Sequence, residues 1–383
     1  MKKFWRKICH LIQTETIFIA GAAALFSMLW APPSLSYMDY IDFRVLTLLF
    51  CLMTVVAGFQ SSGVFFLLAG KILKRINNTR ALSGVLVFLS FFTSMFITND
   101  VALITFVPFA IMLLLLSGQK ELLIPVLVLQ TIAANLGSML TPIGNPQNLF
   151  LYSYYRLTMA EFLAITLPVT VISLILLWLM LFFLKKEEFS VALLGNNRST
   201  FSLAGQQTCG RRQIFGILLY GLLFLLCLGC VNRLIDYRLA LLIILGGILA
   251  FNRQLFKKVD YALLLTFLFF FIFVGNVSHL SGIKEFLSDL TDGRELWVSL
   301  FASQIISNVP AAVLLAPFSE GYKDLILGAN IGGLGTLIAS LACVISYKLY
   351  CRTEDARPGR YLGIFTIYNS LFSLIIVAYL AFA

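Results

Sequence analysis

Two short polar clusters interrupt apolar stretches of this 383-residue chain, and their residue types are those that hold small ions. The first cluster is Thr98-Asn99-Asp100 and the second is Ser307-Asn308-Val309. Ser, Thr, Asn and Asp are preferred helix N-caps, and a helix N-terminus that faces a cavity attracts an anion. Oxygen atoms of unwound backbone at such places can coordinate Na⁺. The two clusters are therefore candidate sites for a small ion or a polar solute.

Two breaks rich in Gly, Pro, Asn or Ser lie in other apolar stretches, at 141–148 and 332–340. Gly and Pro interrupt helices, so each break leaves backbone carbonyl and amide groups without a helical partner. Free carbonyls suit Na⁺, and free amides suit a carboxylate or an oxyanion. The candidate binding residues in and beside the clusters and the breaks are Thr98, Asn99, Asp100, Gly137, Thr141, Pro142, Gly144, Asn145, Asn148, Ser307, Asn308, Val309, Gly332, Gly335, Thr336 and Ser340.

The clusters and the breaks belong to an internal repeat with two blocks. The first block is Ser90, Phe92, Ser94, Ile97, Thr98, Asn99 and Pro108-Phe109, which recurs 209 positions later as Ser299, Phe301, Ser303, Ile306, Ser307, Asn308 and Pro317-Phe318. The second block is Asn135, Gly137, Thr141 and Ile143, which recurs 195 positions later as Asn330, Gly332, Thr336 and Ile338. Small residues are common in membrane helices because they allow close packing. Close packing explains why such residues are frequent, but it does not explain why they recur at one constant offset. Paired interrupted segments at corresponding positions are typical of a transporter binding site.

The composition shows which elements must position these residues. The chain is 60% hydrophobic and only 12% charged, and its mean hydropathy is +0.94. Soluble domains are about 45–50% apolar and about 25% charged, so too little polar surface remains for a water-exposed globule. These values exclude a soluble enzyme, a secreted disulfide scaffold and a disordered chain. The sequence predicts an all-α polytopic membrane protein.

Apolar runs divide the chain into simple helices, broken helices and hairpins. Regions 81–117 and 296–318 are too short for two crossings of about 20 residues each, and each holds an apolar helix, a polar tip and a second apolar helix. They predict re-entrant hairpins whose tips face protein or a wet cavity, because unpaired backbone groups are costly in lipid. Interrupted runs at 121–156 and 322–349 predict broken helices. Simple membrane helices are predicted at 12–30, 43–59, 163–184, 213–230, 238–251, 259–278 and 361–382.

The basic residues set the orientation. With the N-terminus in the cytoplasm, 21 of the 28 Lys and Arg residues fall in cytoplasmic segments, as expected for a multi-pass protein of the cytoplasmic (inner) membrane. This orientation places the C-terminus outside and makes the two hairpins enter from opposite sides. The predicted fold therefore has inverted-topology repeats, each with a re-entrant helical hairpin and a broken transmembrane helix. Because the basic residues follow the membrane pattern, no nucleic-acid partner is expected.

Five segments follow from this arrangement. Scaffold helices and an interfacial arm are expected at 1–80 and again at 213–294. The first transport half is expected at 81–184, and the second at 295–383. A cytoplasmic loop at 185–212 separates the two halves.

Asp100 is the only acidic residue that the sequence places well away from a membrane boundary. Insertion scales assign a cost of roughly 2.5–3.5 kcal/mol to such a group at a helix centre, which indicates a function. The alternative is a hydrated hairpin tip with an ordinary helix cap. A bare carboxylate would repel an anion, so Asp100 favours a coupled cation, a proton, or a substrate that is neutral or positive.

Three stretches carry a family resemblance: FITNDVALITFVPF, NLGSMLTPIGNPQNLF and SQIISNVPAAVLL. They resemble the ion transporter superfamily, which includes arsenite permeases, NhaD-type Na⁺/H⁺ antiporters and citrate and dicarboxylate carriers. The resemblance looks closest to its YbiR-like members, which are bacterial inner-membrane proteins. It implies a homodimer that works by an elevator motion, with arms at 61–80 and 281–294.

The resemblance also implies roles for the tips. In dicarboxylate carriers of this type, Ser-Asn-Thr tips bind Na⁺ and the substrate carboxylate, and here Asp100 and Val309 replace the final threonines. An Asn-Asp pair at the first tip looks more like the arsenite-permease branch. The implied Na⁺ ligands are near Thr98, Asn99, Gly144, Asn145, Ser307 and Asn308.

Two functions compete. The leading prediction is an ion-coupled secondary transporter of a small anion, with Na⁺ or H⁺ as the coupling ion. The alternative is a Na⁺/H⁺ antiporter in which Asp100 is the exchanging acid. The chain has no HExxH motif, no Ser–His arrangement and no Walker-type GxxxxGK[ST] motif, so we expect no enzyme activity, no catalytic residue and no cofactor.

Overall fold

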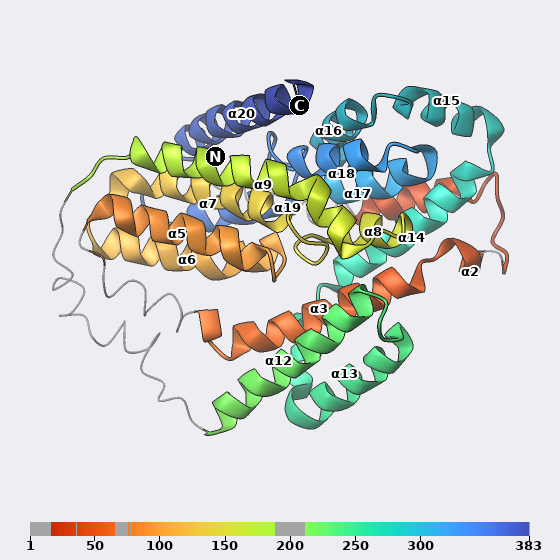
Figure 1. Ribbon diagram of the computed structural model, residues 1–383, viewed down its shortest axis with the longest axis horizontal. Helices are drawn as coiled ribbons and strands as arrows, with labels where there is room; N and C mark the ends of the chain where they lie inside the picture. Colours follow the sequence, from red (N-terminus) through yellow and green to blue (C-terminus); the bar gives the residue numbers. More distant parts are fainter. Residues whose placement is uncertain (1–16, 36, 66–75, 77, 188–210, 383) are drawn as a thin grey trace.

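The protein is helical throughout the part that the structure describes, residues 17–35, 37–65, 76, 78–187 and 211–382 (Figure 1). Eight helices in these ranges are long and apolar enough to cross a membrane. This confirms the predicted all-α polytopic fold. The charged N-terminal segment, much of the first predicted arm at 61–80 and most of the predicted loop at 185–212 lie outside the described residues.

The predicted simple spans are single helices, and several begin at a capping residue. The Asp42 side chain accepts from the Val45 amide at the start of α3, and Thr158 forms a capping box at the start of α9. These caps satisfy amide groups that a helix N-terminus leaves without partners. The observed bounds are 17–27, α3 Phe43–Ser61, α9 Met159–Phe182, α12 Arg211–Val231, α13 Tyr237–Asn252, α14 Tyr261–Ser278 and α20 Pro358–Phe382.

The two predicted hairpins are pairs of helices joined at the polar tips, but they differ in length. The first is α5 Thr79–Ser94 with α6 Asn99–Leu116, and the second is α16 Glu295–Ile306 with α17 Asn308–Leu315. At repeat-equivalent positions, Pro108 lies inside α6, whereas Pro317 lies in the 3-10 turn η3 that follows α17. The second helix of the first hairpin, α6, is by itself long enough to cross a membrane, whereas α5, α16 and α17 are shorter.

The two broken helices are also present as predicted. The first is α7 Leu123–Ser138 followed by α8 Pro146–Tyr154, and the second is α18 Tyr322–Ile331 followed by α19 Leu341–Tyr350. Pro146 is at the first position of α8, where its missing N–H group costs nothing. Each break therefore ends one helix and begins another inside the protein.

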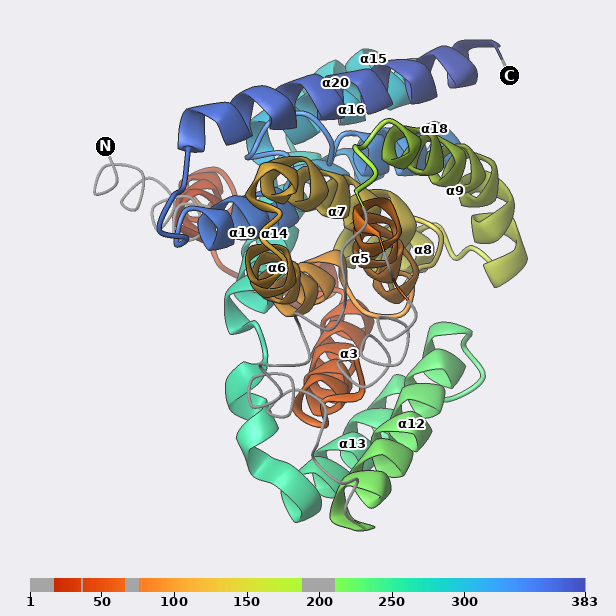
Figure 2. The same cartoon turned by 90° about the vertical axis from the view of Figure 1, so that its left-hand side faces the viewer.

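Helix α7 is the centre of one apolar core. Every residue of α7 except Pro125 is buried, and the helix packs against α5, α6, α9, α19 and α20 (Figure 2). A second apolar core joins α3 and α12–α14 to α8, α17 and α18. In Figures 1 and 2, α12 and α13 lie at the edge of the molecule, beside α3. The polar tips and breaks lie where the elements of the two cores meet.

A short amphipathic helix connects α14 to the second hairpin. It is α15 Ser281–Thr291, and its apolar residues Ile283, Phe286 and Leu290 are exposed. Figure 1 shows it at the periphery of the molecule. An exposed apolar stripe on a charged helix is typical of a helix that lies in a membrane interface, as the sequence predicts for this segment.

Gly137→Ala is expected to lower the melting temperature. An added Cβ at Gly137 in α7 would overlap the Phe91 carbonyl oxygen and crowd the Ser94 hydroxyl of α5. Overpacking of this kind typically costs about 1–3 kcal/mol. The measurement is thermal unfolding of the detergent-solubilised protein.

The matched control is Gly221→Ala in α12. Nothing lies within 4 Å of a Cβ there, and Ala forms helices better than Gly, so this variant should keep or raise the melting temperature. A Gly137→Ala protein as stable as the wild type would show that α5 and α7 do not depend on this close approach.

Candidate functional site

Each hairpin tip is bound to the break of its own half. The Asn99 amide donates to the Gly144 carbonyl at 3.3 Å, and the Asn308 amide donates to the Ala339 carbonyl at 3.0 Å. Both the donors and the acceptors are equivalent in the repeat. The same local sequence therefore builds the same contact twice.

A second repeat-equivalent contact fixes the chain just before each tip. The Thr141 hydroxyl donates to the Met95 carbonyl, and the Thr336 hydroxyl donates to the Gln304 carbonyl at 3.1 Å. In the second half, the Gln304 amide also donates to the carbonyls of Gly332 and Leu334, at 2.8 and 2.6 Å. Sequence reasoning did not identify Gln304, because its partner in the first half is Met95, whose side chain cannot make these bonds.

A buried set of asparagines joins the two halves. The Ser340 hydroxyl donates to Asn135 Oδ1 at 3.2 Å, and Asn145 Nδ2 donates to Asn330 Oδ1 at 3.5 Å. These two contacts are also repeat-equivalent, and all four side chains are buried. Asn99 Nδ2 donates to Asn135 Oδ1 at 2.8 Å, so the first tip takes part in the same network. Buried polar groups are normally hydrogen-bonded in this way, and the network holds both breaks in place.

Four helices begin at this network. Their N-cap residues are Thr98 for α6, Asn145 for α8, Ser307 for α17 and Ser340 for α19. All four are of preferred capping types, yet in these described segments none accepts a hydrogen bond from its own helix. In α6 the Asp100 amide is bound instead by Asn99 Oδ1 at 2.9 Å. The N-cap side chains of α8, α17 and α19 leave the N-termini of these helices uncovered.

The four helix starts line one cavity of about 310 Å³, which we call the first cavity. This volume is at the lower end for a ligand site. Predicted residues that line it are Asn99, Asp100, Ser307, Asn308, Val309 and Ser340. Residues that sequence reasoning did not select also line it: Gln147 at the start of α8 and Asp260, the N-cap of α14.

A second cavity of about 350 Å³ lies beside the first and extends toward α3. Asp100, Asp260 and Pro146 line both cavities. Thr98 and Asn145 line the second cavity, together with Gln60 of α3 and Lys258.

The other predicted residues lie around the two cavities and line neither of them. Several make the contacts that hold the tips and breaks: Thr141 and Thr336 bind the backbone before each tip, and Asn148 Nδ2 donates to the Thr141 carbonyl. The residues in this surrounding group are Gly137, Thr141, Pro142, Gly144, Asn148, Gly332, Gly335 and Thr336.

Within the described part of the chain, three buried polar atoms around the cavities have no hydrogen-bond partner. They are Asp100 Oδ1, Asn145 Oδ1 and Gln147 Nε2. Asn145 is 3% exposed and Gln147 is 1% exposed. An unpaired buried polar group costs about 1–3 kcal/mol, so a bound ion or solute would remove a penalty here. The acceptors suit a cation, and the Gln147 donor suits an anion or a polar oxygen.

Ser307 at the second tip has a strained backbone. Its φ of 74° and ψ of 153° lie in a region that Gly adopts easily and other residues avoid. The hydroxyl of Ser307 donates to the Ala339 carbonyl at 3.4 Å. Strain of this kind persists at binding sites when the surrounding structure holds it, which fits a tip that lines a ligand cavity.

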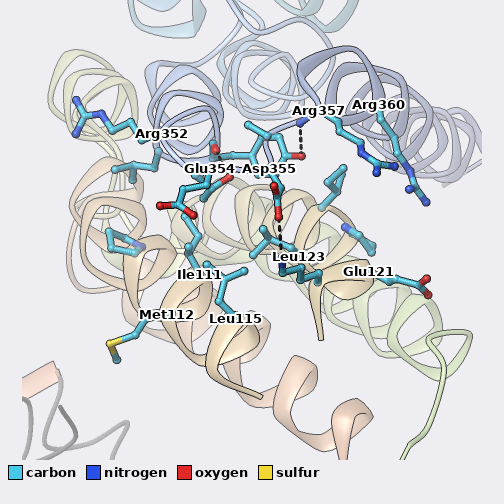
Figure 3. Close-up of a pocket in the computed structure, with 18 of the residues that line it drawn as sticks. Ile111, Met112, Leu115, Glu121, Leu123, Arg352, Glu354, Asp355, Arg357 and Arg360 are labelled. Atoms are coloured by element: carbon cyan, nitrogen blue, oxygen red, sulfur yellow. Dashed lines mark hydrogen bonds and ion pairs between the residues drawn. The ribbon is translucent and has the colours of Figure 1, made fainter. Parts of the chain in front are cut away.

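A larger cavity, of about 1150 Å³, lies away from the tips (Figure 3). Lys120 and Asp355 form a 2.7 Å ion pair within it, and Arg352, Arg357 and Glu354 are exposed at its rim. It contains none of the predicted binding residues. Its charged side chains are of both signs and exposed to solvent, in contrast to the buried polar side chains around the first cavity.

Comparison with known proteins supports a transport site. Residues 9–324, which include both hairpin tips and the first break, match a family described as citrate transporter. An uncharacterized transporter, MJ0456, from Methanocaldococcus jannaschii is 32% identical over 340 residues, covering 88% of this chain and 89% of that protein. Inner membrane protein YbiR from Escherichia coli K12 is 30% identical over 346 residues, covering 88% of this chain and 87% of that protein. The predicted resemblance to YbiR-like members is confirmed.

Ser307→Gly is expected to melt at a higher temperature than Ser307→Ala. Gly adopts the observed φ without strain, whereas Ala retains a strain of about 1–3 kcal/mol, and both variants lose the hydroxyl. The greater freedom of Gly in the unfolded chain removes part of this difference. Thermal unfolding of the two variants side by side gives the comparison. If Ser307→Gly melted below Ser307→Ala, the second tip would not be strained in the folded protein.

Proposed function

Since this chain belongs to the citrate transporter family, we propose that it is an ion-coupled secondary transporter that carries a small anion across the cytoplasmic membrane. The substrate class is a carboxylate or an inorganic oxyanion. The multi-pass fold and the similarity to an inner membrane protein agree with this location. MJ0456 carries the name of a transporter, which agrees with the general function.

The observation that carries the proposal is the meeting at the first cavity of four helix N-termini that have no side-chain cap, beside the start of α14, which Asp260 caps. Each N-terminus acts as a positive charge of about half a unit, so four of them together approach two positive charges. No Lys or Arg lines this cavity among the described residues. An anion would therefore be held by helix dipoles, by free amides and by the side chains of Gln147, Ser307 and Asn308.

The acidic residues at the first cavity suggest that anion transport is coupled to a cation. Asp100 and Asp260 both line the first cavity and together carry two negative charges when ionised. These would repel an anion unless a cation or a proton enters with it. We propose Na⁺ or H⁺ as the coupling ion. Thr98, Asn99, Gly144, Asn145, Ser307 and Asn308 are the proposed surroundings for Na⁺.

The hydrogen bonds support an elevator mechanism for transport. Both tips are bound to the breaks, and both breaks are bound to one another, so the binding residues form one connected unit. Such a unit can move as a body against the remaining helices. We propose that α3 and α12–α14 form the fixed scaffold, that α15 is one of the connecting arms and that the active form is a homodimer.

A second candidate function is Na⁺/H⁺ exchange with Asp100 as the exchanging acid. The observation in its favour is that Asp100 Oδ1 is buried without a hydrogen-bond partner in the described residues. A carboxylate left this way can take up a cation or a proton. The two functions differ in whether an anion crosses the membrane.

Asn308→Ala is expected to lower anion uptake by the purified protein in liposomes. A lost hydrogen bond to a charged ligand costs about 1.5–3 kcal/mol, or roughly 10–150-fold in affinity. Uptake of labelled citrate, succinate, phosphate and sulfate is measured under an imposed Na⁺ or pH gradient.

The matched control is Asn232→Ala, because Asn232 is exposed and its Nδ2 binds only the Leu228 carbonyl of its own helix. Its uptake should equal that of the wild type. Wild-type protein that moved no carboxylate or oxyanion under either gradient would refute anion transport.

Asp100→Asn separates the two candidate functions. If the protein is a Na⁺/H⁺ antiporter, this variant loses Na⁺-induced proton movement, measured with a pH-sensitive dye inside liposomes that contain no anionic substrate. If the protein is an anion transporter, wild-type liposomes show no proton movement without substrate. Proton exchange that persists in a folded Asp100→Asn protein would exclude Asp100 as the exchanging acid.

A further inference from the structure

Asp260 lies at the start of α14, outside both repeated blocks. Its Oδ1 accepts from the Leu263 amide at 3.0 Å and caps the helix. Asp260 is exposed, whereas the residues of the central asparagine network are buried. It lies outside the repeated residues, so the repeat that predicts the tip residues could not predict Asp260.

The cavities connect this exposed carboxylate to the interior. Asp260 and Asp100 line both the first and the second cavity, together with Leu263 and Leu341. Two ionised carboxylates that line the same cavities, as Asp100 and Asp260 do, repel each other. A cation between them would remove this repulsion.

A separate observation points to a ligand in the second cavity. Asn145 lines it and is 3% exposed, and its Oδ1 has no hydrogen-bond partner although its Nδ2 binds Ser138 Oγ at 2.6 Å. Asp100 Oδ1 is likewise buried and unpaired. Amide and carboxylate oxygens are ligands for a hard cation. The unpaired donor, Gln147 Nε2, belongs to a residue that lines the first cavity and not the second.

The other charged groups near this place do not replace a cation. Lys258 lines the second cavity, but its Nζ donates to Ser61 Oγ at 2.8 Å, and no ion pair joins it to Asp260 in the described chain. Cys343 of α19 is a buried thiol whose Sγ accepts from Asn135 Nδ2 of the asparagine network at 3.4 Å. The two carboxylates and Lys258 leave a net negative charge at the cavity.

We propose that Asp260 is a cation-binding residue of the transport cycle, which draws a monovalent cation such as Na⁺ through the second cavity toward Asp100 and Asn145. This inference rests on the proposed function, because it assigns the coupling ion to a particular place. The cavity mouth at Asp260 concentrates cations, since a negatively lined cleft raises the local concentration of its counter-ion. The anion then occupies the first cavity at Gln147 and Asn308, next to the cation.

Asp260→Asn tests the proposal without removing the helix cap. Asn caps helices as well as Asp, so the variant should fold. We expect the Na⁺ concentration for half-maximal uptake to rise about fivefold, as follows from a unit charge removed at about 4 Å in water, while the rate at saturating Na⁺ is retained. Asp260→Glu should restore the wild-type Na⁺ dependence.

The matched control is Asp42→Asn. Asp42 caps α3 through the Val45 amide at 2.9 Å in the same way, and it lines neither cavity. Its Na⁺ dependence should equal that of the wild type. The same Na⁺ dependence in Asp260→Asn and Asp42→Asn would overturn the role of Asp260, as would wild-type uptake that ignores Na⁺ and follows only a pH gradient.

A binding measurement keeps this inference distinct from the proposed function. Thermal unfolding is followed in NaCl and in choline chloride at equal ionic strength, without any anionic substrate. We expect Na⁺ to stabilise the wild type and the Asp42→Asn protein, and to need a higher concentration for Asp260→Asn. If Na⁺ stabilises all three proteins equally, Asp260 is not a cation ligand. If Na⁺ binds as expected but no anion is transported, only the proposed function fails.

Discussion

The structure depends on satisfying backbone groups that membrane depth leaves exposed. A helix that starts inside the bilayer has N–H groups without partners, and lipid offers none. Here α6, α8, α17 and α19 start in the protein interior, and their N-cap side chains do not serve their own helices. The tips are instead bound to the breaks, and the helix starts turn toward one cavity. The unpaired backbone groups that make this fold costly therefore also form the proposed binding site.

Charge at the cavity has two sources that nearly cancel. The four helix N-termini together contribute about two positive charges, and Asp100 and Asp260 contribute two negative charges when ionised. The helix dipoles are fixed by the backbone at the first cavity, whereas the two carboxylates line both the first and the second cavity. This distribution of charge would favour an anion and a cation bound next to each other over either one alone, as the proposed coupled transport requires.

Much of the architecture could be predicted from sequence because membrane helices need long apolar runs, and the bounds of α12 and α14 follow those runs closely. The repeat identified Asn99 and Asn308, since residues that recur at one fixed offset occupy equivalent positions in the two halves. It could not identify Asp260, which has no repeat partner and falls at the edge of a predicted span. It also missed Gln147, because only the cavity shows that this amide lacks a partner.

The asparagine network limits how the protein can move. The contacts between Asn145 and Asn330 and between Ser340 and Asn135 cross from one half to the other at the centre of the molecule. If one half rocked against the other, these buried contacts would break, and each unpaired group would cost about 1–3 kcal/mol. Motion of both tips and both breaks together keeps every one of these bonds. This difference in cost favours the proposed elevator motion, in which this unit moves against the helices that pack around it. In that proposal Asp260, which lies on α14 and outside the network, would be close to Asp100 in only part of the cycle.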